Sequence, residues 1–237
     1  MLYDIQIKSV IPKSAREQLD HFPRCYLGVS LEQEAFEDDR LSGMLDWIAS
    51  RADACRILIG GELHRINLMI WDGLSKEDAL KKARKLGKEF EGRCRLLIHK
   101  YLEGLFSMAH WSGLTIHEKF PKYLNELQIL ARDNKDFSKT IEKTAEGYLM
   151  RQIQHGRILR CSHVEALQFS REYIFEEIAV FAVLASEGWS VDIYPGPELP
   201  ILVEIAQGKY EKAPEPLMCR INIELAVRPV ETLSKAH

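Results

Sequence analysis

The sequence has no Cys-x-x-Cys pair and no apolar run of the roughly 20 residues that a membrane-spanning helix needs. Its five cysteines are widely spaced, which argues against zinc or redox chemistry and favours the reduced thiols of a cytosolic protein. The first residues, MLYDIQIKSVIPKS, lack the apolar core and small-residue cleavage site of a secretory signal. These absences predict a cytoplasmic protein without a membrane-spanning segment.

Net charge is nearly absent as well. With 32 basic and 35 acidic residues the formal charge is −3, so the total identifies no partner and local clusters must be examined instead. The histidines show no metal-like spacing, and no metal is expected. No internal repeat, low-complexity tract or linker interrupts the 237 residues, of which 46% are hydrophobic, so residues 1–237 are expected to form a single domain.

Short β-rich runs alternate with long helical patterns, which is typical of a mainly parallel sheet flanked by helices, that is, of an α/β fold. Expected strands are CYLGVS, CRILIGG at 55–61, 189–196 and 220–229. Expected helices span about 39–54, 75–132, 137–155 and 163–186. The second helix is expected to break near SGLTIHEKFPKY, with Ile116 in a short strand.

A serine ends the first expected strand. In CYLGVS the apolar run stops at Ser30, two residues after Gly28. The carboxyl ends of parallel strands carry ligand sites in open α/β sheets, and glycine permits close approach to the backbone. A serine also commonly caps a following helix, so these residues alone leave both roles open. The continuation, LEQ, lacks the second glycine of a Gly-x-Ser-x-Gly elbow, which argues against an α/β-hydrolase.

The expected helix after Ser75 has one strongly basic face. Its apolar residues gather on one side at helical spacing, and the opposite side carries Lys81, Arg84, Lys85, Lys88 and Arg95. Such a face often serves only solubility. The alternative is contact with a nucleic-acid backbone, because binding to phosphates relieves the mutual repulsion of these charges.

Two further segments carry polar groups toward the same edge of the sheet. Tyr173 and Glu177 are four residues apart and share a helix face, with Glu176 displaced by about 100°. Tyr194 ends a late strand, as Ser30 ends an early one. Three elements are therefore expected to converge at one site.

In this arrangement the sequence resembles the tRNA-dependent cyclodipeptide synthases. The two signatures of that family are matched, in order, by Gly28, Val29 and Ser30 and by Tyr173, Ile174 and Glu177. The late tyrosine, the segment WDGLSKEDA before the basic helix and LAVRP near the end extend the resemblance to nearly the whole chain. Ala179 stands where the family often has proline. Gln33 replaces the asparagine of one subgroup, and Pro195 directly after Tyr194 matches the other.

The resemblance implies a Rossmann-like fold similar to the catalytic domain of class I aminoacyl-tRNA synthetases. It implies an aminoacyltransferase that uses two aminoacyl-tRNAs in sequence, needs no ATP or other cofactor, and releases a cyclic dipeptide (a diketopiperazine). No Gly-x₄-Gly-Lys-Ser/Thr loop is present, which is consistent with this. Ser30 would form an aminoacyl-enzyme in a ping-pong scheme. Glu177 and Tyr173 would hold the ammonium of the first residue, and Tyr194 would line the site.

Several neighbours of these residues are candidates for binding substrate. Gly28 and Gln33 flank the serine, and the alternation of a strand places Asp192 on the same face as Tyr194. An unpartnered buried carboxylate is costly, so Asp192 either lies at a solvated rim or accepts a hydrogen bond from the substrate. The second case predicts histidine or arginine as the first residue, with Tyr26 as a flat wall. The alternative function is a non-catalytic tRNA-binding protein on the same fold.

Overall fold

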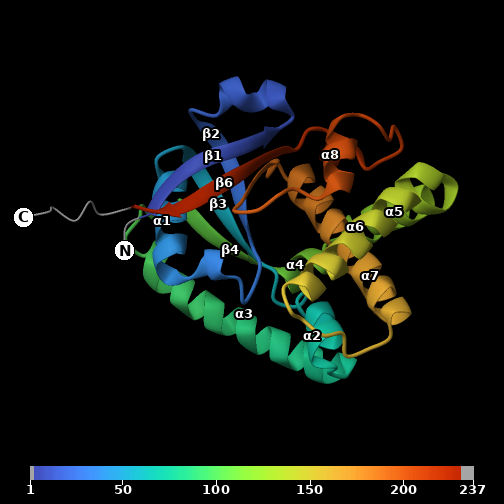
Figure 1. Ribbon diagram of the computed structural model, residues 1–237. Helices are drawn as coiled ribbons and strands as arrows, with labels where there is room; N and C mark the ends of the chain where they lie inside the picture. The colour runs from blue at the N-terminus through green and yellow to red at the C-terminus, as the bar shows by residue number, and fades with distance from the viewer. Residues whose placement is uncertain (1–2, 231–237) are drawn as a thin grey trace, which may run out of the picture.

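The computed structural model describes residues 3–230, which form a six-stranded sheet flanked by helices (Figure 1). The strands are β1 (Tyr3–Ile11), β2 (Phe22–Val29), β3 (Ala52–Ile59), β4 (Phe106–His110), β5 (Val191–Tyr194) and β6 (Ile221–Pro229). Their order in the sheet is β1-β6-β5-β2-β3-β4. All neighbouring pairs are parallel except β1 with β6. The expected mainly parallel α/β sheet is confirmed, and β2 and β5 lie side by side at its centre.

Helices cover both faces of this sheet. They are α1 (Asp38–Ala49), α2 (Arg65–Asp72), α3 (Lys76–Ile98), α4 (Trp111–Thr115), α5 (Phe120–Asp133), α6 (Lys135–Gln154), α7 (His163–Ser186), α8 (Pro200–Ala206) and α9 (Glu215–Met218). Two 3₁₀ segments, Lys13–Gln18 and Glu34–Phe36, lie in the connections. Among the described residues, no helix is both long enough and apolar enough to cross a membrane.

Alternation along the strands divides the core into two layers. Leu27 of β2 packs with α1 and α3 on one face, whereas Tyr26 packs with α7 on the other. The second half of α7 is buried almost all round, because α5 and α6 pack on its outer side. Ser75 and Ser162 cap α3 and α7 by accepting hydrogen bonds from backbone N–H groups of the first turn. These caps fix where the two longest helices begin.

The segment between α3 and α5 differs from the prediction. α3 ends at Ile98, and the short strand is β4, not a strand at Ile116; Ile116 ends α4 and is 84% exposed. Within the described part of the chain β4 pairs with β3 alone and has no fully buried residue, so no apolar run reveals it. β1 also went unpredicted, although Tyr3, Ile5 and Ile7 alternate with more exposed residues, the period-two pattern of a half-exposed strand.

Candidate active site

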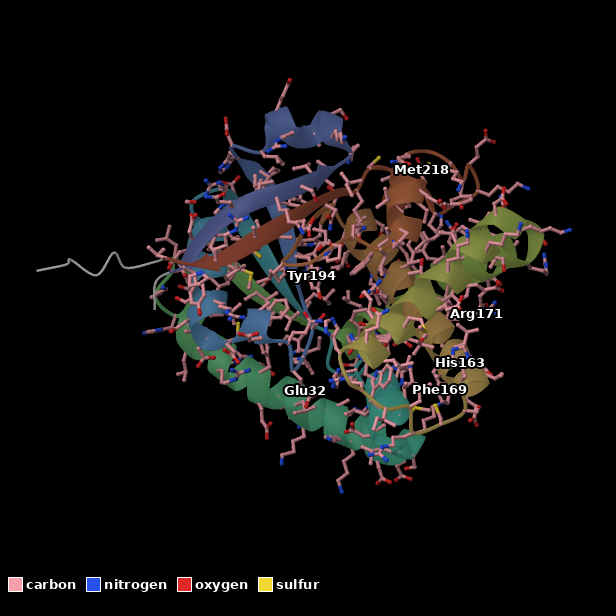
Figure 2. All side chains as sticks on the ribbon, in the orientation of Figure 1. Glu32, His163, Phe169, Arg171, Tyr194 and Met218 are labelled. Atoms are coloured by element: carbon pink, nitrogen blue, oxygen red, sulfur yellow. The ribbon has the colours of Figure 1, made fainter. Side chains whose placement is uncertain are left out.

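A cavity of about 460 Å³ opens where β2 and β5 end. Its lining comes from the β2 and β5 ends, the start of α2, the facing sides of α6 and α7, and the segment after β5. Figure 2 shows Tyr194 near the middle of the molecule, between the sheet and these helices. Four of the residues expected to carry the chemistry line this cavity, namely Ser30, Tyr173, Glu177 and Tyr194. The predicted convergence of three elements therefore occurs in the structure.

Ser30 follows the last residue of β2 and is bonded across the sheet. Its Oγ lies 2.9 Å from the hydroxyl of Tyr194, and that hydroxyl donates to Gln33 Oε1 at 3.2 Å. The following 3₁₀ segment is preceded by Gln33 and has no side-chain cap, so Ser30 does not cap a helix. Burial raises the pKa of Tyr194, which keeps the phenol neutral near pH 7. Tyr194 can therefore orient Ser30 and relay a proton, but it is no phenolate base.

Two glycines lie against the ring of Tyr194, and one of them fits closely. A Cβ on Gly196 would lie 2.7 Å from Tyr194 Cε1, far inside van der Waals contact, so only glycine permits this ring position. A Cβ on Gly28 would lie 3.7 Å from Tyr194 Cδ2, which is ordinary contact. The ring of Phe36 supports Tyr194 from a centroid distance of 6.1 Å. Tyr194 is thus held in place by its neighbours.

Glu177 and Tyr173 face the cavity from one side of α7, as their spacing predicted. Within residues 3–230, the Glu177 carboxyl has neither an ion pair nor a hydrogen bond. Burial, with the nearby charges of Glu198 and Asp192, raises the pKa of Glu177 to about 8. Burial also raises the pKa of Tyr173 well above its ordinary value. The cavity therefore contains a carboxyl group that lacks a cation.

The adjacent carboxylate, Glu176, serves the structure instead. Arg65 of α2 donates to both of its oxygens, at 3.1 and 2.6 Å, and the indole N–H of Trp111 donates at 2.7 Å. These bonds tie α2 and α4 to α7 and leave Glu176 outside the cavity lining. They also fix the rotation of α7, because α7 must present Glu176 to Arg65 while it presents Glu177 to the cavity.

Beneath the cavity lies a buried arginine that the sequence did not reveal. Arg220 donates from Nε to the Tyr26 hydroxyl at 2.8 Å and from Nη2 to Asp192, and its Nη1 lies 2.8 Å from Glu198 Oε2. Its guanidinium also lies over the ring of Phe181, at 4.6 Å from the centroid. Burial raises the pKa values of Asp192 and Glu198, and the charge of Arg220 opposes that rise.

Arg220 changes two predictions. Asp192 does line the cavity, but it is 4% exposed and already has a partner, so the premise of a partnerless carboxylate is wrong. Tyr26 is completely buried in the core and does not belong to the cavity lining, so it is no wall of the site. Its ring packs 5.6 Å from that of Phe181, and its hydroxyl helps to position Arg220.

A second pair that the sequence did not reveal holds the loop after Ser30. Glu32 has a φ of 62°, a strained value for a residue with a side chain, and its Oε2 lies 2.9 Å from Nε2 of the buried His64. Both residues line the cavity. Burial lowers the pKa of His64, so the pair is a hydrogen bond to a largely neutral imidazole at pH 7. No local pattern marks either residue.

The basic face of α3 is exposed as predicted, but acidic neighbours engage part of it. Arg84 donates to Glu62 at 2.6 Å, and Lys85 lies 3.7 Å from Glu89. Arg95 pairs with Glu91. Lys81 and Lys88 are the members of the predicted set without an ion pair in the described part of the chain. No group of three or more His, Cys, Asp or Glu side chains in residues 3–230 is arranged to hold a metal.

Comparison with known proteins gives a match in structure and none in sequence. No protein-family model and no curated protein matches the chain. A cyclodipeptide synthase from Fluoribacter dumoffii is 17% identical with a TM-score of 0.78, and the match covers 96% of this chain and 100% of that one. One from Candidatus Glomeribacter gigasporarum, solved bound to Phe-tRNAPhe, is 17% identical with a TM-score of 0.66, covering 97% and 99%.

A third solved structure, from Mycobacterium tuberculosis, is 14% identical with a TM-score of 0.71 and is matched over 96% of this chain and 93% of that one. It was reported as demonstrating that cyclodipeptide synthetases are related to type I tRNA synthetases. At such low identities the likeness establishes the fold. The chain has the fold of the cyclodipeptide synthases, which the order of its motifs led us to expect.

Proposed function

We propose that this protein is a cyclodipeptide synthase that joins the aminoacyl groups of two aminoacyl-tRNAs. The observation that carries the proposal is the cavity itself, which is lined by both a positioned serine hydroxyl and a carboxyl group without a cation. An aminoacyl-tRNA carries a group that matches each of these. Its ester carbonyl carbon can be attacked by the serine hydroxyl, and its ammonium can pair with the carboxyl group. The match to a structure solved with Phe-tRNAPhe supports the choice of substrate class.

In the first step Ser30 Oγ attacks the ester carbonyl of the first aminoacyl-tRNA. The new bond joins Oγ to the acyl carbon, the bond to the ribose oxygen breaks, and the serine proton ends on the tRNA hydroxyl. Tyr194 orients Oγ from 2.9 Å. An ester is a far easier acyl donor than an amide, so the step needs no histidine base. Splitting the overall transfer in this way is ordinary nucleophilic catalysis.

The remaining steps close the ring. The amine of the second aminoacyl-tRNA attacks the Ser30 ester, which forms the first peptide bond and returns the proton to Oγ. Ser30 Oγ then attacks the ester of the dipeptidyl-tRNA; the bond to the ribose oxygen breaks, and the second tRNA leaves with the serine proton on its hydroxyl. The free amine of the dipeptide attacks the new Ser30 ester. The second peptide bond completes the diketopiperazine and frees Ser30. Tyr173, a neutral phenol beside Glu177, is placed to move a proton in this closure.

Glu177 and Tyr173 hold the ammonium of the first residue until the ring closes. An ammonium that replaces the proton on Glu177 supplies the missing cation at the cost of releasing that proton. Gln33 keeps Tyr194 in position, and Gly28 leaves room for the acyl group. Aminoacyl-tRNAs are cytoplasmic, so we place the protein in the cytoplasm.

The basic face of α3 would bind the tRNA backbone. Interactions with phosphate carry little sequence information, so they can serve both tRNAs. Replacing Lys81 and Lys88 with alanine should weaken binding of both tRNAs and lower the salt slope, log Kd against log[salt], by about 1 for each phosphate that is no longer neutralised. Replacing Lys122 of α5, which pairs with Glu126, is the matched control. A slope equal to that of the wild type in the double variant would assign the α3 face to solubility.

The decisive test is trapping the acyl-enzyme. The protein is mixed with charged tRNAs, quenched in acid and analysed by intact mass, while the small products are analysed by mass spectrometry. The wild type should show one aminoacyl adduct and cyclic dipeptides, and Ser30→Ala should show neither while unfolding at the same temperature. An adduct that survives in Ser30→Ala would refute the covalent assignment. Binding of tRNA with neither adduct nor product would favour the non-catalytic alternative.

A further inference from the structure

The floor of the cavity contains buried oxygens that lack partners. Within residues 3–230, Asp192 Oδ1 and Asn222 Oδ1 have no hydrogen-bond partner of good geometry, although the side-chain amide of Asn222 lies close enough to stabilise the Asp192 carboxylate, and both residues line the cavity. Glu198 Oε2 meets Arg220 as an ion pair but is not in line for a hydrogen bond. Buried polar atoms without partners are rare in folded proteins, and each calls for an explanation. Their gathering on one wall of one cavity points to a ligand that supplies donors.

The strand register places this floor deeper in the sheet than the proposed nucleophile, in the row of Tyr26. Asp192 of β5 is in register with Tyr26 of β2 and Asn222 of β6, which forms one row across the sheet. Tyr194 lies two residues further along β5, which is about 6–7 Å. Gly28 opens the way between them, since a Cβ there would lie only 3.9 Å from Asp192 Oδ1. An acyl group on Ser30 can therefore extend over Gly28 to the floor.

The floor offers acceptor oxygens to a ligand, whereas the N–H groups of Arg220 are not available to it. Arg220 donates to Tyr26 and Asp192 and forms an ion pair with Glu198, and it does not belong to the cavity lining. One guanidinium faces two carboxyl groups, so the floor offers more acceptor oxygens than Arg220 can satisfy. An acidic side chain would be repelled there, and an aliphatic one would leave the acceptors unpaired.

We propose that this floor, formed by Asp192, Asn222 and Glu198, selects a first aminoacyl group whose side chain ends in N–H donors, arginine or histidine. The inference rests on the proposed function, because it needs an acyl group on Ser30. The α-ammonium of this residue binds at Glu177. Its side chain spans the distance between the rows of Tyr194 and Asp192, so that its N–H groups reach the floor. Asn222 and Glu198 are thereby specificity-determining residues.

The test measures which amino acid loads the enzyme. Single-turnover formation of the Ser30 adduct is followed by intact mass with arginyl-, histidyl-, lysyl-, leucyl-, phenylalanyl- and glutamyl-tRNA in separate reactions. A site built to bond a donor rejects an analogue without it by about 10⁴-fold, so arginyl or histidyl adducts should form at least about 10³-fold faster than leucyl. Faster loading of leucine, phenylalanine or glutamate would overturn the inference. No adduct with any tRNA would instead refute the proposed function.

Variants of the floor separate recognition from folding. Asn222→Leu removes one acceptor, and Gly28→Val covers Asp192 Oδ1. Each should slow loading of the preferred cationic residue by about 100-fold or more and reduce its advantage over leucine. Glu224→Gln is the matched control, because Glu224 is a buried carboxyl two residues further along β6 that bonds Lys8 and Ser9 outside the cavity.

The thermal unfolding of each variant is measured alongside its loading assay. If either Asn222→Leu or Gly28→Val fails to fold, the result of the other variant is used. An unchanged ratio of cationic to leucyl loading in a folded Asn222→Leu or Gly28→Val protein would contradict the proposed floor. If Glu224→Gln also reduced the ratio of cationic to leucyl loading, the effect would come from any change in the sheet. That result would contradict the proposed floor as well.

Discussion

Glu177→Gln should make the stability of this protein less dependent on pH. The ordinary pKa of a glutamate is 4.5, and the fold raises the pKa of Glu177 to about 8. Between these values the folded protein holds a proton that the unfolded chain releases. The free energy of unfolding of the wild type therefore falls as pH rises through this window, and this contribution is constant above about pH 8. Glutamine imitates the protonated carboxyl at every pH and lacks this dependence.

The size of the effect follows from the shift. Each unit of pKa corresponds to about 1.4 kcal/mol, so a fully sealed carboxyl with this shift would lose on the order of 4 kcal/mol between pH 5 and pH 9. Glu177 borders an open cavity whose solvent tempers the loss. We therefore expect the difference in unfolding free energy, Glu177→Gln minus wild type, to increase by about 2–4 kcal/mol from pH 5 to pH 9.

Urea unfolding at half-unit steps of pH measures this difference directly. Taking the difference cancels every other titrating group. Glu172→Gln removes an exposed carboxyl from the same helix and should change the unfolding free energy by less than about 0.5 kcal/mol. A Glu177→Gln curve parallel to that of the wild type would show that Glu177 is ionised in the free protein. The cavity would then stabilise a charged Glu177 without a substrate cation, contrary to the proposed ammonium site.

Two further substitutions test how the site is held. Gly196→Ala should displace the Tyr194 ring and slow acyl-enzyme formation about 10-fold, as expected for an orienting bond worth about 1.4 kcal/mol. Gly28→Ala is the control, because its new Cβ makes only ordinary contact and should not slow the reaction. Equal rates for the two variants would refute the close fit at Gly196. Arg65→Ala should lower the unfolding free energy by about 2–4 kcal/mol, because it leaves the Glu176 carboxylate without its cation. Adding Glu176→Gln should recover part of that loss. A double variant no more stable than Arg65→Ala alone would show that loss of the ion pair is not the cause.

The sequence was sufficient to predict that four side chains, Ser30, Tyr173, Glu177 and Tyr194, line one cavity. Ser30 directly follows one buried strand and Tyr194 ends another, and the carboxyl ends of neighbouring parallel strands share one edge of a sheet. Tyr173 and Glu177 follow from helical spacing alone. Each rule places a side chain from its own strand or helix, so it applies without knowledge of strand order; the contact between Ser30 and Tyr194 also needs β2 and β5 to be neighbours. The same locality explains why α7 was placed correctly and why β4, an edge strand without a buried run, was not.

The floor of the cavity obeys no such local rule. Arg220 lies 28 residues from Asp192 and 194 residues from Tyr26, and the three meet only because β6, β5 and β2 are neighbours in the sheet. A lone arginine before a strand carries no signal of burial, since arginine is ordinarily exposed. The strand order is therefore what turns Asp192 from an isolated carboxylate into part of a charged cluster. The proposed specificity floor can be recognised only from long-range strand pairing, whereas Ser30, Tyr173, Glu177 and Tyr194 each stand in a short motif that the sequence shows. A substitution at Asn222, the β6 member of the row that contains Asp192, should accordingly change which amino acid is loaded, while Ser30 still forms an adduct.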